Sequence, residues 1–409
     1  MAGSSVVRPE EIRRHNLGLV LRQIHRHGEL TRAELTTLLG LNRSTIGGLV
    51  TDLVNLGMVS EHVPAGRDRA GRPSYVVAPR EDGPYVLAVD IEVEQITSAA
   101  VGLGGRVYAR RHTSTQRDPI SPAAAVAQIG RDLRWLSARL PADAVLYGAG
   151  ISVPGTVRRS DGLVEHAPNL EWREVALATL LADRFGGELD VQVGNDANLG
   201  ALAEHQRGAA LGLDNVIYLN GSVGVGGGVI IDGAELHGVG GYAGEIGHIM
   251  LNPEGPACHC GSTGCIETYI GEHALLREAG VTGTFGPQAA AEVFADAGRG
   301  VPAAAGAVAH VGLWLGRTLA TLVNVFNPEA IIVGGTLSEV VRLRRDIVEA
   351  EVDRRAMAAA RAAVRILTPG LGQESSLIGA SELAFQTLLA APDAGAGLSI
   401  HSSVGAAAH

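Results

Sequence analysis

The stretch GYAGEIGHIMLNPEGPACHCGSTGCIE, residues 241–267, contains every cysteine of this 409-residue chain. Cys258, Cys260 and Cys265 lie within eight residues, and His248 precedes them. An odd, clustered set of cysteines indicates a metal site and not a set of disulfides. Three thiolates and one imidazole suit Zn²⁺ and leave no position for water, so we predict a structural zinc site at these four residues. The alternative is that the three thiols are close in sequence by chance and bind no metal.

The same stretch has the glycines that a compact metal-binding loop requires. Gly261 and Gly264, which lie between the second and third thiols, allow the tight turns of the loop. His259 is a competing ligand, but its side chain faces away if Cys258 and Cys260 both bind the metal. We call residues 248–265 the zinc knuckle.

On both sides of this stretch, short apolar runs alternate with amphipathic helical patterns, which favours an α/β architecture. The Ala-, Gly- and Ser-rich segment at 392–409 is low in complexity, and we expect it to be disordered. The strand-like runs are 85–93, 145–153, 189–196, 216–231 and 330–335, and the helical patterns fall near 121–139, 172–185, 197–211, 267–278, 286–298, 302–326, 338–354 and 375–390.

Length and hydropathy limit the kinds of protein that this chain can be. A chain of 409 residues exceeds one ordinary core, so two or three domains are expected. No run of 18 uninterrupted apolar residues occurs, and the N-terminus lacks the apolar segment of a secretory signal. We therefore expect a cytoplasmic protein without a membrane partner.

Residues 1–80 have a pattern of their own. Apolar residues of 11–27 fall on one helical stripe, Thr31 begins a second helix with a capping box, and Asn42 caps a third. The segments MVSEHV and PSYVVAP then predict two strands around a loop. Three helices and a β-hairpin in this order predict an α+β winged helix-turn-helix domain.

Residues 1–80, which we call the head, differ in net charge from the remainder of the chain. Residues 1–80 hold 11 Arg against 7 acidic residues, whereas the remainder holds 22 Arg against 36. A basic head on an acidic body indicates that only the head meets a polyanion, with chance asymmetry and a protein-binding winged helix as alternatives. Arginine on a Gly-flanked wing suits the minor groove, and the third helix suits the major groove. We expect DNA contacts from Thr31, Arg43, Ser44, Thr45, Arg67, Arg69 and Arg72.

Four motifs together resemble the ROK family of repressors and sugar kinases. They are VPGTV (153–157), GNDAN (194–198), GYAGEIGH (241–248) and CHCGSTGCIE (258–267), within a similarity that covers about 85–390. With the winged head, the chain is similar to the regulator branch that includes N-acetylglucosamine, glucose and xylose repressors. The resemblance implies a two-lobed actin/hexokinase-like domain and a dimer or tetramer. Repressor heads often carry Ser and a basic residue where this chain has Gly47 and Gly48, which favours a larger contribution from the wing.

The resemblance also implies a sugar pocket, since carboxylates and amides accept and donate the paired hydrogen bonds of sugar hydroxyls. His248 would bind zinc through one ring nitrogen and leave the other for a hydroxyl. Asp196 stands where the kinases keep their general base, and a structural or helix-capping Asp is the alternative. The family pattern places sugar contacts at Asn195, Asp196, Glu245, His248 and Glu267, with Asn169 on the rim.

The phosphate-binding segments depart from the kinase pattern. The kinases have D-x-G-x-T after the first strand, but here Glu92 replaces the Gly and Glu94 adds a second acid. Carboxylates a few ångströms from phosphate in a partly desolvated site cost several kcal/mol. The second loop, usually G-T-G-x-G-x-G, begins with Ser222 and Val223, so a hydroxyl donor is lost. We therefore expect no catalytic residues and no kinase activity.

These observations predict a sugar-responsive transcriptional repressor of carbohydrate genes. Its domains are residues 1–80, the winged head, and 81–391, a ROK sugar-kinase-like sensor containing the zinc knuckle. Its expected partners are operator DNA, a sugar or sugar-phosphate effector and further copies of the chain, with Zn²⁺ as cofactor. An active hexokinase with a DNA-binding appendage and a DNA-binding scaffold with a vestigial pocket are the alternatives.

Overall fold

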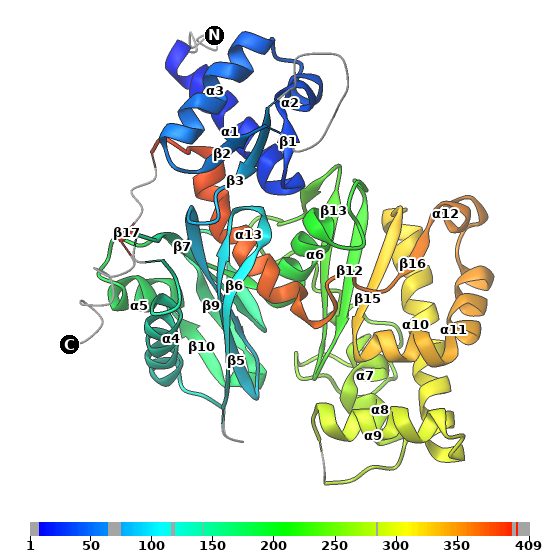
Figure 1. Cartoon of the computed structure of the whole chain (residues 1–409). Coiled ribbons are helices and arrows are strands. Elements are labelled where there is room, and N and C mark those ends of the chain that lie inside the picture. Colours follow the sequence, from blue (N-terminus) through cyan, green and yellow to red (C-terminus); the bar gives the residue numbers. More distant parts are fainter. Residues whose placement is uncertain are drawn as a thin grey trace, which may run out of the picture. The chain divides into compact units, whose positions relative to one another are not determined.

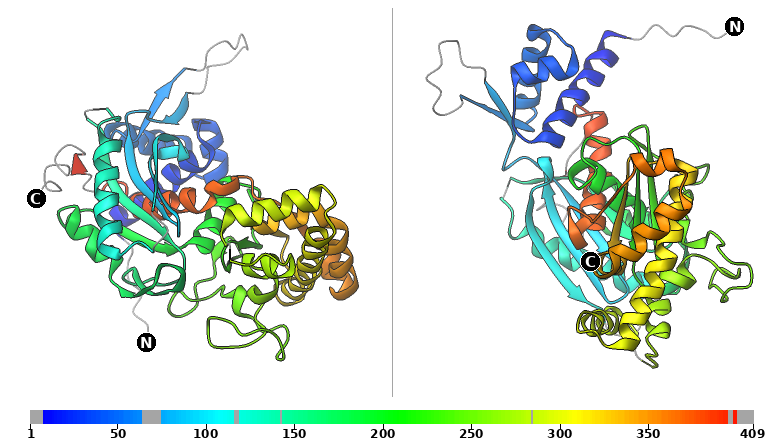
Figure 2. Two further views of the ribbon diagram at one scale, coloured as in Figure 1. Left: turned by 90° about the horizontal axis from the view of Figure 1, so that it is seen from below. Right: turned by 90° about the vertical axis from the view of Figure 1, so that its right-hand side faces the viewer.

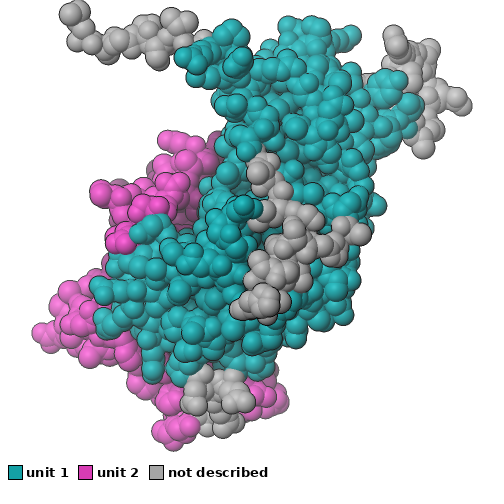
Figure 3. Space-filling view, turned by 90° about the vertical axis from the view of Figure 1, so that its left-hand side faces the viewer, with its two compact units in different colours: residues 1–153, 161–194, 380–409 teal, residues 154–160, 195–379 magenta. Residues whose placement is uncertain are grey.

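The computed structural model (Figure 1) describes residues 8–63, 75–115, 119–141, 143–283, 285–394 and 398–399. Contacts within the chain divide it into two units, coloured in Figure 3. Unit 1 comprises residues 1–153, 161–194 and 380–409, and unit 2 comprises residues 154–160 and 195–379.

The head of unit 1 contains the three helices and the two-stranded hairpin that the sequence predicts, together with a third short strand. The Thr31 hydroxyl accepts from the Glu34 amide at 3.1 Å while the Glu34 carboxylate accepts from the Thr31 amide at 2.7 Å, which confirms the capping box. Asn42 caps the third helix by accepting from the Thr45 amide at 2.8 Å. The helices are α1 (Pro9–His27), α2 (Arg32–Leu39) and α3 (Arg43–Asn55), and the sheet order is β1 (Leu30–Thr31), β3 (Val76–Pro79), β2 (Val59–His62). The sequence patterns did not indicate β1.

The remainder of unit 1 is built on a mixed sheet in which all of β4 (Pro84–Ile91) is buried. Strand β4 pairs in parallel with β7 (Val145–Val153) and antiparallel with β5 (Gln95–Gly102). The edge strands are β6 (Val107–Ser114) and β11 (Val191–Asn195), and the helices of this part are α4 (Pro122–Ser137) and α5 (Leu177–Arg184). Within the segment expected to be disordered, β17 (Leu398–Ser399) pairs with β7, while residues 395–397 and 400–409 lie outside the described part.

One predicted helix in unit 1 is wrong at its start. Residues 172–175 form strand β10 (Trp172–Val175), paired with β9 (Leu163–Ala167), and helix α5 begins only at Leu177. Glu171 and Glu174 adopt φ values of 58° and 50°, which an α-helix excludes. The buried Trp172 donates its ring N–H to the Ile120 carbonyl at 2.8 Å, so a distant contact overrides the local helical pattern.

Unit 2 is a five-stranded sheet with helices on both faces (Figure 1, Figure 2). Alternate residues of β12 (Val216–Gly221) face opposite sides: Val216 and Tyr218 pack with α6 (Asp196–Arg207), and Ile217 and Leu219 join the core of α10 (Pro302–Phe326) and α11 (Thr336–Arg355). The sheet order is β14 (Ala234–Glu235), β13 (Val225–Ile231), β12, β15 (Ala330–Gly335), β16 (Arg365–Leu367). The smaller elements are β8 (Thr156–Arg158), α7 (Glu267–Ile270), α8 (Glu272–Glu278), α9 (Pro287–Gly298) and α12 (Ala358–Ala363).

Two sequence-predicted elements of unit 2 are each divided in the structure. The run 216–231 is a hairpin of β12 and β13, and the helical pattern 267–278 is two short helices that meet at Gly271. Helix α10 is long and apolar enough to cross a membrane, but 61% of its most apolar window is buried in the protein, where it packs on α8, α9 and α11. We therefore interpret α10 as a buried helix of the core.

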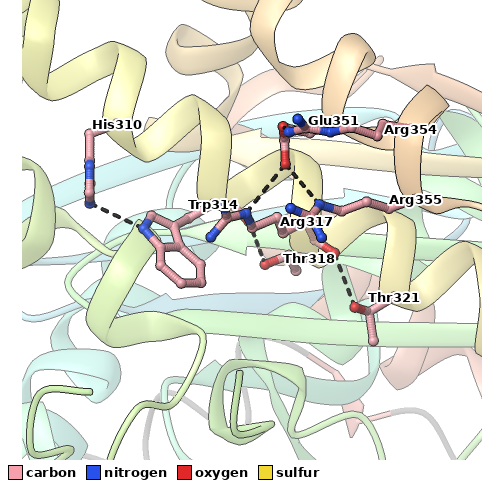
Figure 4. A network of polar contacts seen from close by, with 8 residues as sticks. All are labelled: His310, Trp314, Arg317, Thr318, Thr321, Glu351, Arg354 and Arg355. Atoms are coloured by element: carbon pink, nitrogen blue, oxygen red, sulfur yellow. Dashed lines mark hydrogen bonds and ion pairs between the residues drawn. The ribbon is translucent and has the colours of Figure 1, made fainter. Parts of the chain in front are cut away.

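A polar cluster joins α10 and α11 (Figure 4). The Glu351 side chain is 6% exposed and pairs with Arg317 at 3.3 Å, with Arg355 at 2.9 Å and also with Arg354. Arg317 in turn lies over the Trp314 ring at 4.4 Å. The cluster satisfies a buried carboxylate, as burial of a charge requires.

Helix α13 (Ser375–Ala390) is continuous, but its residues are divided between the two units. Residues 375–379 belong to unit 2, and residues 380–390 belong to unit 1.

Candidate functional site

The four predicted metal ligands converge in unit 2. One donor atom from each of His248, Cys258, Cys260 and Cys265 lies within 4.8 Å of the other three. Short backbone contacts shape the loop: the Cys258 amide donates to the Ser262 carbonyl at 2.8 Å. Gly261 and Gly264 adopt φ values of 91° and 66°, which confirms that both turns need glycine.

The spacing of these donors fits a tetrahedral zinc ion. Zn–S bonds of about 2.3 Å and Zn–N bonds of about 2.0–2.1 Å require S···S edges of about 3.8 Å and S···N edges of about 3.6 Å. The structure has 3.7 Å between the Cys260 and Cys265 sulfurs and 3.6 Å between the Cys258 sulfur and His248 Nδ1. His248 therefore presents Nδ1 to the metal position, and His259 is not part of the cluster among the described residues.

The protein around the thiols disfavours the thiolate form of Cys258 and Cys265 but favours that of Cys260. Burial raises the pKa of the Cys258 and Cys265 thiols. Burial acts to raise the pKa of the Cys260 thiol as well, but hydrogen bonds from the Ser262 backbone and the other two sulfurs hold it below its ordinary value. A bound dication would stabilise all three thiolates.

Three predicted sugar contacts lie in the zinc knuckle or next to it. Glu267, the first residue of α7, has Oε1 at 3.7 Å from His248 Nδ1 and 3.0 Å from the Cys258 sulfur. Glu245 precedes the short helix that ends at His248, and its pKa is raised, chiefly because the surrounding protein desolvates the carboxylate and also because Glu267 is near. Glu245, His248 and Glu267 therefore form one polar group, two carboxylates and an imidazole, beside the metal position.

Asp196 occupies the first turn of α6, where the helix dipole favours a carboxylate. Its Oδ1 accepts from the Ala197 amide at 2.9 Å and from Asn195 Nδ2 at 3.0 Å. The helix cap itself is Asn195, whose Oδ1 accepts from the amides of Ala197 and Asn198, both at 3.0 Å. Asp196 is thus beside the cap and not the capping residue.

The Asn195 side chain is fully engaged. Besides the two bonds to its oxygen, its Nδ2 donates to the Gly155 carbonyl and to Asp196 Oδ1, both at 3.0 Å. An amide side chain has two acceptor and two donor positions, and all four are filled. A direct contact between Asn195 and a sugar stays a prediction that requires one of these bonds to be exchanged.

Glycines of β13 let both α6 and the Glu245 loop pack closely on the strand. A Cβ on Gly226 would lie 2.7 Å from the Ala197 Cβ, and one on Gly227 would lie 2.5 Å from Ile246. Both residues are ladder-paired strand positions, opposite Asn220 and Leu219. The glycine-rich run is therefore explained by close packing around the strand, and its glycines are not by themselves evidence for a nucleotide.

Sequence reasoning missed a residue that secures α6. Glu204 is fully buried, and its carboxylate accepts from the Ala209, Gly370 and Leu371 amides and from the Ser375 hydroxyl, at 2.7 to 3.0 Å. Its partners lie up to 171 residues away, so no local pattern indicated it. Glu204 joins the helix that carries Asp196 to the start of α13.

Two predicted features belong to unit 1. Asn169 is exposed on the short helix Pro168–Leu170, and its sugar contact stays a prediction. Glu92 and Glu94 are exposed in the tight turn between β4 and β5, where the Glu92 amide donates to the Gln95 carbonyl at 2.9 Å and the Glu92 carboxylate accepts from the Gln95 side chain.

The head presents Arg43, Ser44 and Thr45 in the first turn of α3. Arg43 is exposed and has no ion-pair partner in the part of the chain that the structure describes. The Ser44 hydroxyl donates to Asn42 Oδ1 at 2.7 Å. The Thr31 hydroxyl donates to Glu34 Oε2 at 2.8 Å.

Arg32, by contrast, is neutralised within the head. Arg32 forms a bidentate pair with Glu61 at 2.5 Å, and a Cβ on Gly47 would lie 3.3 Å from the Arg32 guanidinium. The predicted wing contacts Arg67, Arg69 and Arg72 lie outside the described residues.

A winged helix-turn-helix head followed by a sugar-kinase-like domain with a Cys₃His cluster defines a two-part regulatory class of protein. The chain belongs to the ROK family, whose model matches residues 86–387, and a MarR family model matches residues 18–70 of the head.

Relatives of this chain fall into two groups. A xylose repressor of Bacillus spizizenii is 29% identical over 380 residues, which cover 92% of this chain and 97% of the repressor. A crystal structure of a ROK family transcriptional regulator, a homologue of the E. coli MLC protein, has a TM-score of 0.77 at 25% identity and covers 97% of this chain and 100% of that one. A glucokinase of Streptomyces coelicolor is 32% identical over 315 residues, 73% of this chain and 96% of the glucokinase. The similarity to the repressor and the regulator therefore extends over nearly the whole chain, whereas the similarity to the kinase does not.

Proposed function

We propose that this protein is a cytoplasmic, zinc-containing transcriptional repressor that binds operator DNA through residues 1–80 and a sugar through residues 81–391. One observation carries the proposal: a winged head and a ROK domain occur in one chain that resembles a repressor over 92% of its length. The name of that relative makes D-xylose the first effector to test.

In this proposal Asp196, Glu245, His248 and Glu267 take the sugar hydroxyls. The carboxylates accept hydrogen bonds, and His248 holds Zn²⁺ through Nδ1 and offers Nε2 to the sugar. Asn195 orients Asp196 through the bond from its Nδ2. Bound zinc would hold the knuckle that supports Glu267. Asn169 stays a candidate on the rim.

The head would contact DNA through Thr31, Arg43, Ser44 and Thr45, with the wing arginines Arg67, Arg69 and Arg72 on the backbone or minor groove. A homodimer or homotetramer would place heads on operator half-sites about one or two helical turns apart. Sugar binding would change operator affinity by about 5- to 150-fold, the usual range for allosteric coupling.

The experiment begins with an operator selected from random duplex DNA by the full-length protein. Operator affinity is then measured with and without D-xylose, D-glucose and N-acetylglucosamine, and at several salt concentrations, where it should fall steeply with salt. Asp196→Ala and Glu245→Ala should still bind operator but ignore the sugar, and the exposed Asp183→Ala should behave as wild type. A wild-type protein that binds none of these sugars or selects no DNA would contradict the proposal.

An active sugar kinase is the second candidate, favoured by the similarity to glucokinase. Exposed carboxylates at Glu92 and Glu94 disfavour it, because they repel the phosphates of ATP. We expect purified protein to consume no ATP in the presence of each sugar. Sugar-dependent ATP consumption would show that the protein is not a repressor alone.

A further inference from the structure

We propose that helix α13 transmits the state of the sugar site to the DNA-binding head, with the buried His25–Glu382 pair as the contact through which the head responds. The inference rests on the proposed function and concerns the regulation of the same sugar site. It is drawn from contacts made separately within each unit by one continuous helix.

Within unit 2, the first turn of α13 is held tightly against α6, the helix that carries Asp196. The Ser375 hydroxyl donates to the buried Glu204 carboxylate at 2.8 Å, and the Ser376 hydroxyl donates to the Asp196 carbonyl at 3.2 Å. A Cβ on Gly379 would lie 2.0 Å from the Leu199 carbonyl oxygen, so the two helix backbones touch. A displacement of α6 by a bound sugar must therefore displace the start of α13.

Within unit 1, the rest of α13 is held against the head. His25, at the end of α1, is 2% exposed, and its Nε2 lies 3.0 Å from Glu382 Oε2. Its ring also packs on Phe385, with the ring centroids 4.7 Å apart. About two helical turns nearer the N-terminus of α1, a Cβ on Gly18 would lie 2.5 Å from the Leu389 carbonyl oxygen.

The hydrogen bonds of His25 define its tautomer. The Gly104 amide donates to Nδ1 at 3.1 Å, so Nδ1 carries the lone pair and Nε2 carries the proton that is donated to Glu382. One imidazole therefore joins α1, α13 and the short helix Leu103–Gly105. Such a bond is directional and buried, so the position of α13 determines which orientation of α1 satisfies it.

The side chain of Arg14 adds a peripheral contact, at 2.9 Å from Asp393, just after α13. This ion pair is exposed on both sides and contributes little, as surface pairs do. The buried pair and the close backbone contact at Gly18 are therefore the parts of the joint that can carry a change of position.

Calorimetry first identifies which of D-xylose, D-glucose and N-acetylglucosamine binds the protein. The test then measures the ratio of the operator affinities with and without that sugar. Glu382→Leu removes the acceptor of His25 and should shrink that ratio by about 2- to 30-fold, while sugar binding and cooperative melting persist. Glu382→Gln still offers an oxygen to His25 Nε2 and should keep most of the wild-type ratio. His15→Gln, on the exposed side of α1, is the matched control and should keep all of it.

A Glu382→Leu protein with the wild-type ratio would overturn the proposal, although the repressor function would stand. If that variant does not fold, amide hydrogen exchange of the wild type decides: sugar should alter exchange in residues 18–28 and at Gly104. Unchanged exchange there, with a normal shift in operator affinity, would also overturn it. A wild type without any sugar response contradicts the proposed function instead.

Discussion

Replacing Cys260 by serine removes one of the four donors of the zinc knuckle. Serine keeps the shape of the side chain, but its hydroxyl is a poor ligand for Zn²⁺ at neutral pH. Structural zinc sites of small domains bind with about 10–16 kcal/mol. An equal share for each of four ligands is about 2.5–4 kcal/mol, so losing one ligand weakens zinc binding by about 10²- to 10³-fold. The donor spacings of 3.6 and 3.7 Å match the edges of an undistorted tetrahedron, so they give none of these donors a strained position.

Elemental analysis of purified wild-type protein should find one zinc per chain. Competition with a chromophoric chelator then gives the zinc affinity of both proteins. Cys260→Ser should also lose its sugar response, because Glu267 lies 3.0 Å from the Cys258 sulfur and depends on the same loop. His259→Gln is the matched control, since that imidazole adjoins Cys260 but lies outside the donor cluster. A zinc-free wild type, or equal zinc affinity in wild type and Cys260→Ser, would refute the reasoning.

Three further predictions concern the DNA contacts of the head, the pH dependence of stability and the Glu351 cluster. Arg43→Ala should cost about 1–3 kcal/mol on the selected operator and relax its discrimination, whereas Arg72→Ala should weaken binding to all DNA and lower the salt slope by about one; equal losses on all sequences for both variants would contradict these roles. Burial raises the pKa of Glu235 to about 7, so the folded state keeps a proton that the unfolded state has released above about pH 4.5. The contribution of Glu235 to the free energy of unfolding should therefore fall by about 3 kcal/mol as pH rises from 4.5 to 7. Urea titrations at several pH values should show that the free energy of unfolding falls less steeply with pH in Glu235→Gln than in wild type; an equal dependence on pH in both proteins would argue against the shift. Glu351→Ala should destabilise the protein by about 1–3 kcal/mol, because three arginines lose their shared partner. The half-buried Glu339, which pairs with Arg342 near the surface, is the control, and Glu339→Ala should stay within about 0.5 kcal/mol; equal effects would mean that the Glu351 cluster stabilises nothing.

Local patterns in the sequence were sufficient for the elements whose stability is local. The capping box at Thr31, the cap at Asn42 and the limits of α10, α13, β7 and β15 were all predictable, because each depends on residues within a few positions. The Cys₃His cluster was predictable for the same reason, since three of its four ligands lie on one short loop.

Only the tertiary structure decided the contacts between distant residues. Strand β10 replaced the start of a predicted helix because Trp172 meets Ile120, and the glycines of β13 are explained by close packing against α6 and the Glu245 loop. Three of the four hydrogen bonds of the Asn195 side chain are to the next three residues, but the fourth, to the Gly155 carbonyl, comes only from the fold. Glu204 and the His25–Glu382 pair join segments 171 and 357 residues apart. Periodicity and propensity report only on neighbours along the chain, so burial and hydrogen bonding between such segments had to come from the fold.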